Sequence, residues 1–137
     1  MSFDDIRSAS IIRYPYLWSR QARKGESEGR KERPVAVAFR LSRKCGGDVL
    51  ILLAITSQLP QADYNCIEIP DTEKQRAGLN PDKRAWVMLN EYNEDLAGHS
   101  YYLQPGSKLG NFSKPFFVRL IRKFIKGRET TNRISRH

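Results

Sequence analysis

The sequence predicts a single domain of the α+β class, mainly β, with short antiparallel strands and two helical segments. Three observations support this prediction. Short apolar or alternating segments recur between glycine, proline and polar residues, which is typical of β-strands. One segment near the C-terminus instead repeats its apolar residues with the helical period. The length of 137 residues suits one domain with a single modest core.

The first two strands are expected at residues 11–18 and 34–41. Residues 11–18 are rich in β-branched and aromatic side chains, and Pro15 favours an edge position or a bulge. In residues 34–41 apolar side chains alternate with small or charged ones, which is the pattern of a strand with one buried face. Residues 19–32 carry densely mixed charge and two glycines, so a long loop is expected between the strands.

Residues 49–55 are apolar throughout, as expected for a central strand that is covered on both sides. A glycine-containing hairpin joins this strand to the preceding one. Shorter strands are expected at residues 66–69, 85–89 and 101–103.

Two helices are expected. The shorter covers residues 70–77, with Asp71 as its N-cap. The longer covers residues 115–126, begins after a Ser113 N-cap, and is amphipathic with basic residues on its polar side. Its apolar side should pack across the sheet through Phe116, Leu120, Ile121 and Phe124. The basic tail that follows, residues 127–137, is expected to be flexible.

These elements together favour an SH3-like antiparallel barrel with a short interior helix and a C-terminal amphipathic helix. Periodicity alone supports the mainly β class and leaves the closure of the barrel open. No apolar run reaches the roughly 20 residues of a membrane span, and the N-terminus lacks the layout of a signal peptide. Two cysteines without metal-site or disulfide spacing point to reduced thiols, so a cytoplasmic protein without metal or cofactor is expected.

The positive charge is concentrated near the C-terminus. The chain carries a net charge of +9, and residues 114–137 hold eight Lys and Arg against one Glu. Such a surplus favours a polyanionic partner, either nucleic acid or an acidic protein segment. A solvated basic tail that only aids solubility is the alternative, and charge alone does not separate these possibilities.

The clearest functional pattern lies in residues 26–41. A charged loop containing Glu28 runs into Arg33 and Pro34 at the start of a strand. Pro34 is tolerated at the first strand position and biases Arg33 toward an extended conformation, so Arg33 sits at a rigid junction. A second pair of polar residues, beginning at Thr56, ends the central strand.

These motifs, in this order, resemble the MazF/PemK (Kid-type) toxins of bacterial toxin–antitoxin systems. The resemblance covers residues 11–96 and is sharpest at Glu28-Gly29, Arg33-Pro34-Val35-Ala36-Val37 and Ile55-Thr56-Ser57. It implies an SH3-like barrel, a homodimer, and metal-independent, sequence-specific cleavage of single-stranded RNA to 2′,3′-cyclic phosphate and 5′-OH ends. It also implies a cognate antitoxin protein whose C-terminal segment blocks the RNA groove. One departure is that residues 90–95 lack the arginine often found there in the family.

By this resemblance Arg33, Thr56 and Glu28 are the catalytic residues. The reaction needs a base for the 2′-OH, positive charge for the phosphorane and a proton for the departing 5′-oxygen. The Arg33 guanidinium can hold two phosphate oxygens, Thr56 can donate a hydrogen bond to the same phosphate, and Glu28 is the base. RNA-binding residues are expected from the same segments: Ser57, Tyr16, Arg30, Lys31 and Gln58.

Other interpretations stay open. Arg33 can instead form a surface salt bridge with Glu28 or Glu32, and the chain can be a non-catalytic RNA- or protein-binding barrel. A gyrase-inhibiting toxin resembling CcdB is less favoured, because that family acts through a C-terminal Trp-Gly-Ile and this chain ends Arg-Ile-Ser-Arg-His. Tyr16 and Trp18 can stack on unpaired bases or belong to the core, and the core is favoured for Trp18.

Overall fold

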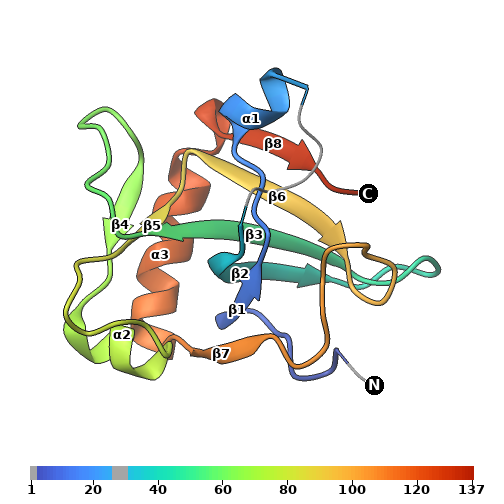
Figure 1. The fold of residues 1–137 in the computed structure, drawn as a ribbon, viewed down its shortest axis with the longest axis horizontal. Coiled ribbons are helices and arrows are strands. Elements are labelled where there is room, and N and C mark those ends of the chain that lie inside the picture. The colour runs from blue at the N-terminus through green and yellow to red at the C-terminus, as the bar shows by residue number, and fades with distance from the viewer. Residues whose placement is uncertain (1–2, 26–30) are drawn as a thin grey trace.

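The computed structural model describes residues 3–25 and 31–137. Two of the predicted site residues, Glu28 and Arg30, therefore lie outside the described residues. Within the described part, eight strands form one mainly antiparallel sheet, and helices cover one face and the edges (Figure 1). The predicted α+β, mainly β class is confirmed.

The bounds of the elements are as follows. The strands are β1 Ser10–Tyr14, β2 Arg33–Leu41, β3 Val49–Thr56, β4 Cys66–Glu68, β5 Trp86–Met88, β6 Glu91–Leu96, β7 Lys108–Asn111 and β8 Asn132–Ser135. The helices are α1 Ser19–Arg23, α2 Asp71–Arg76 and α3 Lys114–Lys126, with a 3-10 turn η1 at Arg128–Thr130. Neighbouring strands follow the order β4-β5-β3-β2-β1-β7, while β6 pairs with β3 and, in parallel, with β8.

Strand β3 lies at the centre of the sheet. It pairs with β2 along one side, and with β5 and β6 along the two halves of its other side. Its alternate side chains enter two different core clusters, with Leu53 in one and Leu52 in the other. The prediction of a central strand covered on both sides is thereby confirmed.

Strand β2 is also buried on both faces, so the prediction of a single buried face was wrong. Val35 and Val37 belong to one core cluster, whereas Ala36 and Ala38 belong to the other. A bulge between Val37 and Phe39 shifts the register, and Phe39 packs against the same cluster as Ala36. Ala36 and Ala38 lie on a face that other elements cover closely. From the sequence pattern alone, this alanine-containing face could not be told from a solvent-exposed one.

Helix α3 crosses the sheet and covers one core cluster (Figure 1). Phe116, Leu120 and Phe124 are buried at a four-residue spacing, as the helical period predicted. Ser113 stands at the predicted N-cap position, but its side chain forms no capping bond within α3. Its backbone N–H and hydroxyl instead donate to the buried Glu73 carboxylate of α2, at 2.8 and 2.7 Å. Glu73 therefore joins the two helices.

The N-terminal region differs from the prediction. The expected strand over residues 11–18 ends at Tyr14, and the segment expected to be entirely loop begins with the short helix α1. Trp18 is the N-cap residue of α1, and its backbone N–H donates to the Gln21 side chain. Helix α2 begins at Asp71 itself, so Pro70 rather than Asp71 is its N-cap.

Strand β6 was missed because its buried face is polar. Glu91, Asn93 and Asp95 point inward, and each is hydrogen-bonded to the segment around β1 and α1. This pattern inverts the apolar alternation by which a strand is recognised. The strand expected at residues 101–103 does not form, and β7 lies beyond it at Lys108–Asn111.

The basic tail forms ordered structure rather than the flexible segment that was expected. Residues after α3 continue into η1 and β8, and β8 pairs in parallel with β6 from Glu91↔Asn132 to Glu94↔Ser135. Ile134 and Arg136 are buried. Among the described residues, no helix is long and apolar enough to cross a membrane.

Candidate functional site

The site lies where the start of β2 meets the end of β3. The two strands are antiparallel, and Val35 pairs with Ala54. Arg33 lies two residues before Val35, and Thr56 lies two residues after Ala54, so both share the face of that pair. The fold thus brings together two residues that are 23 positions apart in the sequence.

A cavity of about 570 Å³ opens beside these two residues. Its walls come from the segment before α1, from α1, from the start of β2, from β5 and from the loop after β3. It is lined by Tyr16, Trp18, Arg20, Gln21, Lys31, Arg33, Thr56, Ser57, Gln58, Leu59, Pro60, Gln61, Tyr64 and Met88. Every predicted site residue that the structure describes is in this set.

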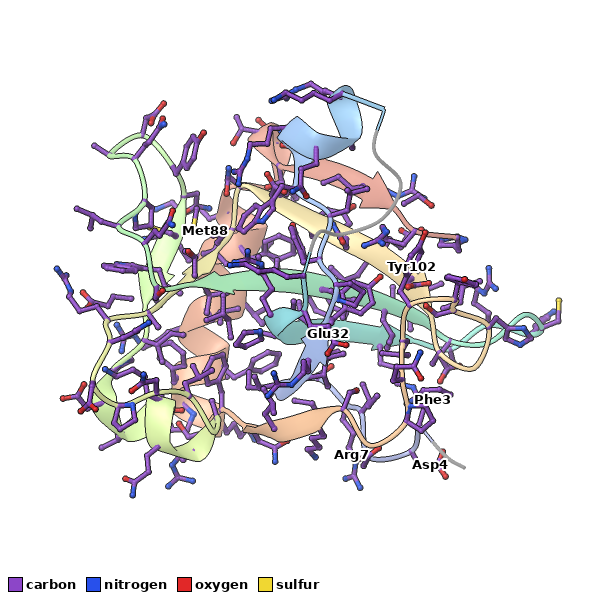
Figure 2. All side chains as sticks on the ribbon, in the orientation of Figure 1. Phe3, Asp4, Arg7, Glu32, Met88 and Tyr102 are labelled. Carbon is purple, nitrogen blue, oxygen red and sulfur yellow. The ribbon has the colours of Figure 1, made fainter. Side chains whose placement is uncertain are left out.

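A second cavity of about 300 Å³ adjoins the first at the same residues. Lys31, Arg33, Thr56 and Ser57 line both cavities. We call the two cavities together the Arg33 groove. Figure 2 labels one lining residue of each, Met88 for the larger cavity and Glu32 for the smaller. Arg33 and Thr56 therefore line two adjoining spaces, each of which can hold part of an extended ligand.

Arg33 carries a charge that no described carboxylate neutralises. Its guanidinium carbon lies 5.0 Å from the centre of the Trp18 ring, and its Nε is buried without a hydrogen-bond partner. Burial, and then the nearby positive charge of Arg20, lower the pKa of Arg33. The alternative salt bridge with Glu32 does not form in the described structure. A partly buried charge without a partner is costly, so an anion bound in the cavity against this guanidinium would stabilise Arg33.

Thr56 is oriented by the turn that follows it. The backbone N–H of Gln58 donates to Thr56 Oγ1 at 3.2 Å. This bond uses the hydroxyl as an acceptor, which leaves its proton available to donate. Ser57 and Gln58 are exposed on the same turn. A ligand oxygen in the groove can therefore accept a hydrogen bond from Thr56 while contacting Arg33.

The aromatic residues divide into buried and accessible ones. Tyr16 is only 1% exposed and donates its hydroxyl to Glu91 at 3.2 Å, so it lines the cavity floor and offers no free face for base stacking. Trp18 packs edge-on against Tyr16 with ring centres 5.0 Å apart, and its predicted place in the core is confirmed. Tyr64 is 41% exposed and lines the same cavity. The accessible aromatic residue of the site is therefore Tyr64, which the sequence analysis missed.

Strand β6 supports the wall of the groove from behind. The buried Glu91 carboxylate accepts hydrogen bonds from the Ser19 backbone N–H at 2.9 Å and from the Ser19 hydroxyl at 2.8 Å. Burial and the Glu91 charge raise the pKa of Tyr16, so its hydroxyl stays protonated and remains a donor. These bonds hold the start of α1, and with it Trp18 and Arg20, against the groove.

The electrostatics of the groove favour a negatively charged ligand. Arg20, Lys31 and Arg33 line the larger cavity, and none of its described lining residues is acidic. Lys83 adds a cation to the smaller cavity, whereas Arg84 there is paired with Glu68 at 2.8 Å. Glu32 is the acidic residue among those lining this cavity in the described structure. Cationic side chains beside an accessible aromatic ring are typical of sites for single-stranded nucleic acid.

Comparison with known proteins adds no relative. No family model matches the chain, and no curated protein matches it.

Proposed function

We propose that this chain is a metal-independent endoribonuclease of the MazF/PemK type, built on an SH3-like barrel and acting as the toxin of a toxin–antitoxin system. One observation carries the proposal. Arg33 and Thr56 together line two adjoining cavities, and among the described residues no acidic side chain forms an ion pair with Arg33. A phosphodiester at this point would place its neighbouring nucleotides in the two cavities.

The proposed reaction is transesterification within the RNA. The 2′-oxygen attacks phosphorus and the bond from phosphorus to the 5′-oxygen breaks, which leaves a 2′,3′-cyclic phosphate and a 5′-OH. Arg33 and Thr56 would bind the phosphate oxygens as negative charge develops on them. Glu28, which precedes β2 in the sequence, would take the proton of the 2′-OH, and water in the open groove would protonate the departing 5′-oxygen.

The proposal also includes partners. The positive charge of the groove suits the acidic C-terminal segment of a cognate antitoxin, which would compete with RNA for the same residues. A homodimer is proposed on the resemblance alone.

A cleavage assay tests the proposal. A long unstructured RNA is incubated with the purified protein in EDTA, and the ends of the fragments are analysed. We expect discrete cuts with cyclic phosphate and 5′-OH ends, and at least about a tenfold slower reaction for Thr56→Val, because a hydrogen bond to the phosphate is lost. Thr72→Val, at an exposed threonine of α2, is the matched control and should cut at the parental rate. Intact RNA in the parent reaction would refute the proposal.

A second candidate is a non-catalytic RNA-binding protein. It is favoured by one observation: the described lining of the larger cavity contains neither a carboxylate nor a histidine to move a proton. The same assay separates the two functions, because this candidate would bind the RNA and leave it intact. Intact RNA without binding would point to a protein target instead.

A further inference from the structure

A third cavity lies along helix α3 and shares no lining residue with the Arg33 groove. It has a volume of about 700 Å³ and is lined by Asn65, Ile67, Arg119, Arg122, Lys123, Lys126 and Gly127. We call it the α3 cavity. Its four basic residues are spaced by three, one and three positions, which places them on one face of the helix.

The charges of this face are not neutralised by their neighbours. Arg119, Arg122 and Lys126 are exposed, and in the part of the chain that the structure describes no carboxylate pairs with them. Lys123 donates to the Cys66 carbonyl at 2.6 Å, which holds its ammonium group beside β4. The face therefore presents positive charge along about 10 Å of helix, given the rise of 1.5 Å per residue.

The α3 cavity approaches the Arg33 groove at the start of β4. Tyr64 lines the groove and the next residue, Asn65, lines the α3 cavity. On the adjacent strands β4 and β5, Cys66 pairs with Met88, and Met88 also lines the groove. A single strand that leaves the groove past the exposed Tyr64 ring would reach the α3 cavity around this edge of the sheet.

The two surfaces differ in the chemistry that they offer. The groove has aromatic rings as well as cations, whereas the described lining of the α3 cavity contains no aromatic residue. Cations without rings bind the sugar–phosphate backbone but do not stack bases. An acidic protein segment would use apolar anchors as well as charge, and here the lining provides only the half-buried Ile67. The lining therefore favours nucleic-acid phosphates over a protein ligand.

We propose that the α3 cavity binds the backbone phosphates of single-stranded RNA that extends beyond the Arg33 groove. This inference rests on the proposed function, because it takes RNA as the occupant of the groove. The α3 face adds affinity that does not depend on sequence, and it favours long RNA over short RNA.

The test compares two RNA lengths. An oligonucleotide of about 6 nucleotides fills the groove alone, and one of about 20 nucleotides can also reach α3. The variant Arg119→Ala/Arg122→Ala/Lys126→Ala removes three exposed charges, and Arg7→Ala/Arg13→Ala/Lys44→Ala removes three exposed charges elsewhere. Binding of each RNA is measured by fluorescence anisotropy over a range of salt concentrations.

We expect the α3 variant to bind the long RNA at least about tenfold more weakly at low salt, with a salt slope smaller by about 2, while its affinity for the short RNA stays parental. The control variant should change both affinities only slightly and equally. Parental affinity and slope of the α3 variant for the long RNA would overturn the inference. An equal loss in the control variant would also overturn it, because net charge alone would then explain the effect.

Two further outcomes separate this inference from the proposed function. If the parent protein leaves both RNAs uncut while the α3 variant loses long-RNA binding, the proposed activity fails and the α3 site stands. Polyglutamate serves as the probe for an acidic protein ligand. If the α3 variant loses polyglutamate binding and keeps its affinity for long RNA, the surface is a protein site and the inference is overturned.

Discussion

Arg136 and Arg33 both lie against aromatic rings, but their surroundings are opposite. Arg136, just after β8, is buried with its guanidinium carbon 3.9 Å from the centre of the Tyr102 ring. Its Nη1 donates to the Asn93 side chain at 3.0 Å and to the Pro15 carbonyl at 2.8 Å. This arginine ties the C-terminal end of the chain to β6 and to the segment after β1.

Arg33 also lies beside a ring, that of Trp18, but its Nε is buried without a partner. Satisfied donors stabilise the fold, whereas a guanidinium that lines a cavity without a carboxylate partner can bind an anionic ligand. The comparison therefore separates a structural arginine from a candidate functional one. It also predicts that the two residues respond oppositely to substitution.

The largest effect is expected for Arg33→Ala. Loss of its charge from the proposed transition state should reduce RNA cleavage by about 100-fold or more, and should relieve growth arrest on overexpression. The unfolding free energy should change by less than about 1 kcal/mol, because only the contact with Trp18 is lost. Initial cleavage rates and urea unfolding measure the two quantities. Arg43→Ala, at an exposed hairpin residue, is the control; undiminished cleavage by Arg33→Ala would contradict the assignment.

Arg136→Ala should show the reverse pattern. Removing its buried hydrogen bonds should lower the unfolding free energy by about 2–3 kcal/mol, and the melting temperature by roughly 6–12 °C. The cleavage rate of the folded fraction, measured well below the melting temperature, should stay within about twofold of the parental rate because Arg136 does not line the groove. A stable Arg136→Ala protein would show that the C-terminal strand contributes little to the fold.

The smallest effect is expected for Arg133→Ala, on the exposed side of β8. Arg133 donates to the Glu94 carboxylate at 2.7 and 3.0 Å, but its side chain is 55% exposed. The substitution should lower the free energy of unfolding by less than about 1 kcal/mol near neutral pH. Comparing its free energy of unfolding with that of Arg136→Ala, on the same segment, then isolates how much burial of an arginine contributes to stability.

The pH dependence sharpens this contrast. Hydrogen bonds from Arg133, and then from His137, lower the pKa of Glu94 below its usual value of 4.5. A carboxylate whose pKa is lowered by folding stabilises the folded protein at pH values above its unfolded-state pKa. This stabilisation is lost as the pH falls through the lower, folded-state pKa. Urea unfolding between about pH 7 and pH 3 should therefore show a smaller acid-induced loss for Arg133→Ala than for the parent. Equal losses would assign the acid sensitivity to other groups.

Much of this protein follows from local sequence patterns. Residue spacing along the chain predicted β2, β3 and α3, because a strand or helix with an apolar face repeats its apolar residues with a fixed period. Helix α2 was predicted from the capping and acidic residues at its start instead. The same local reasoning placed Arg33 at the start of one strand and Thr56 at the end of the next. Antiparallel pairing of consecutive strands then brings such residues to one edge.

Only the tertiary structure decided the remaining features. Strand β6 buries Glu91, Asn93 and Asp95, which are tolerated inside because partners distant in sequence satisfy their hydrogen bonds. Strand β8 forms because β6 offers it a parallel edge. Tyr64 joins the groove from a loop whose path its own residues do not specify. A sequence pattern reports how often apolar residues recur along one face of a helix or strand. The partners of a buried polar group, or of an open strand edge, depend instead on how the whole chain packs.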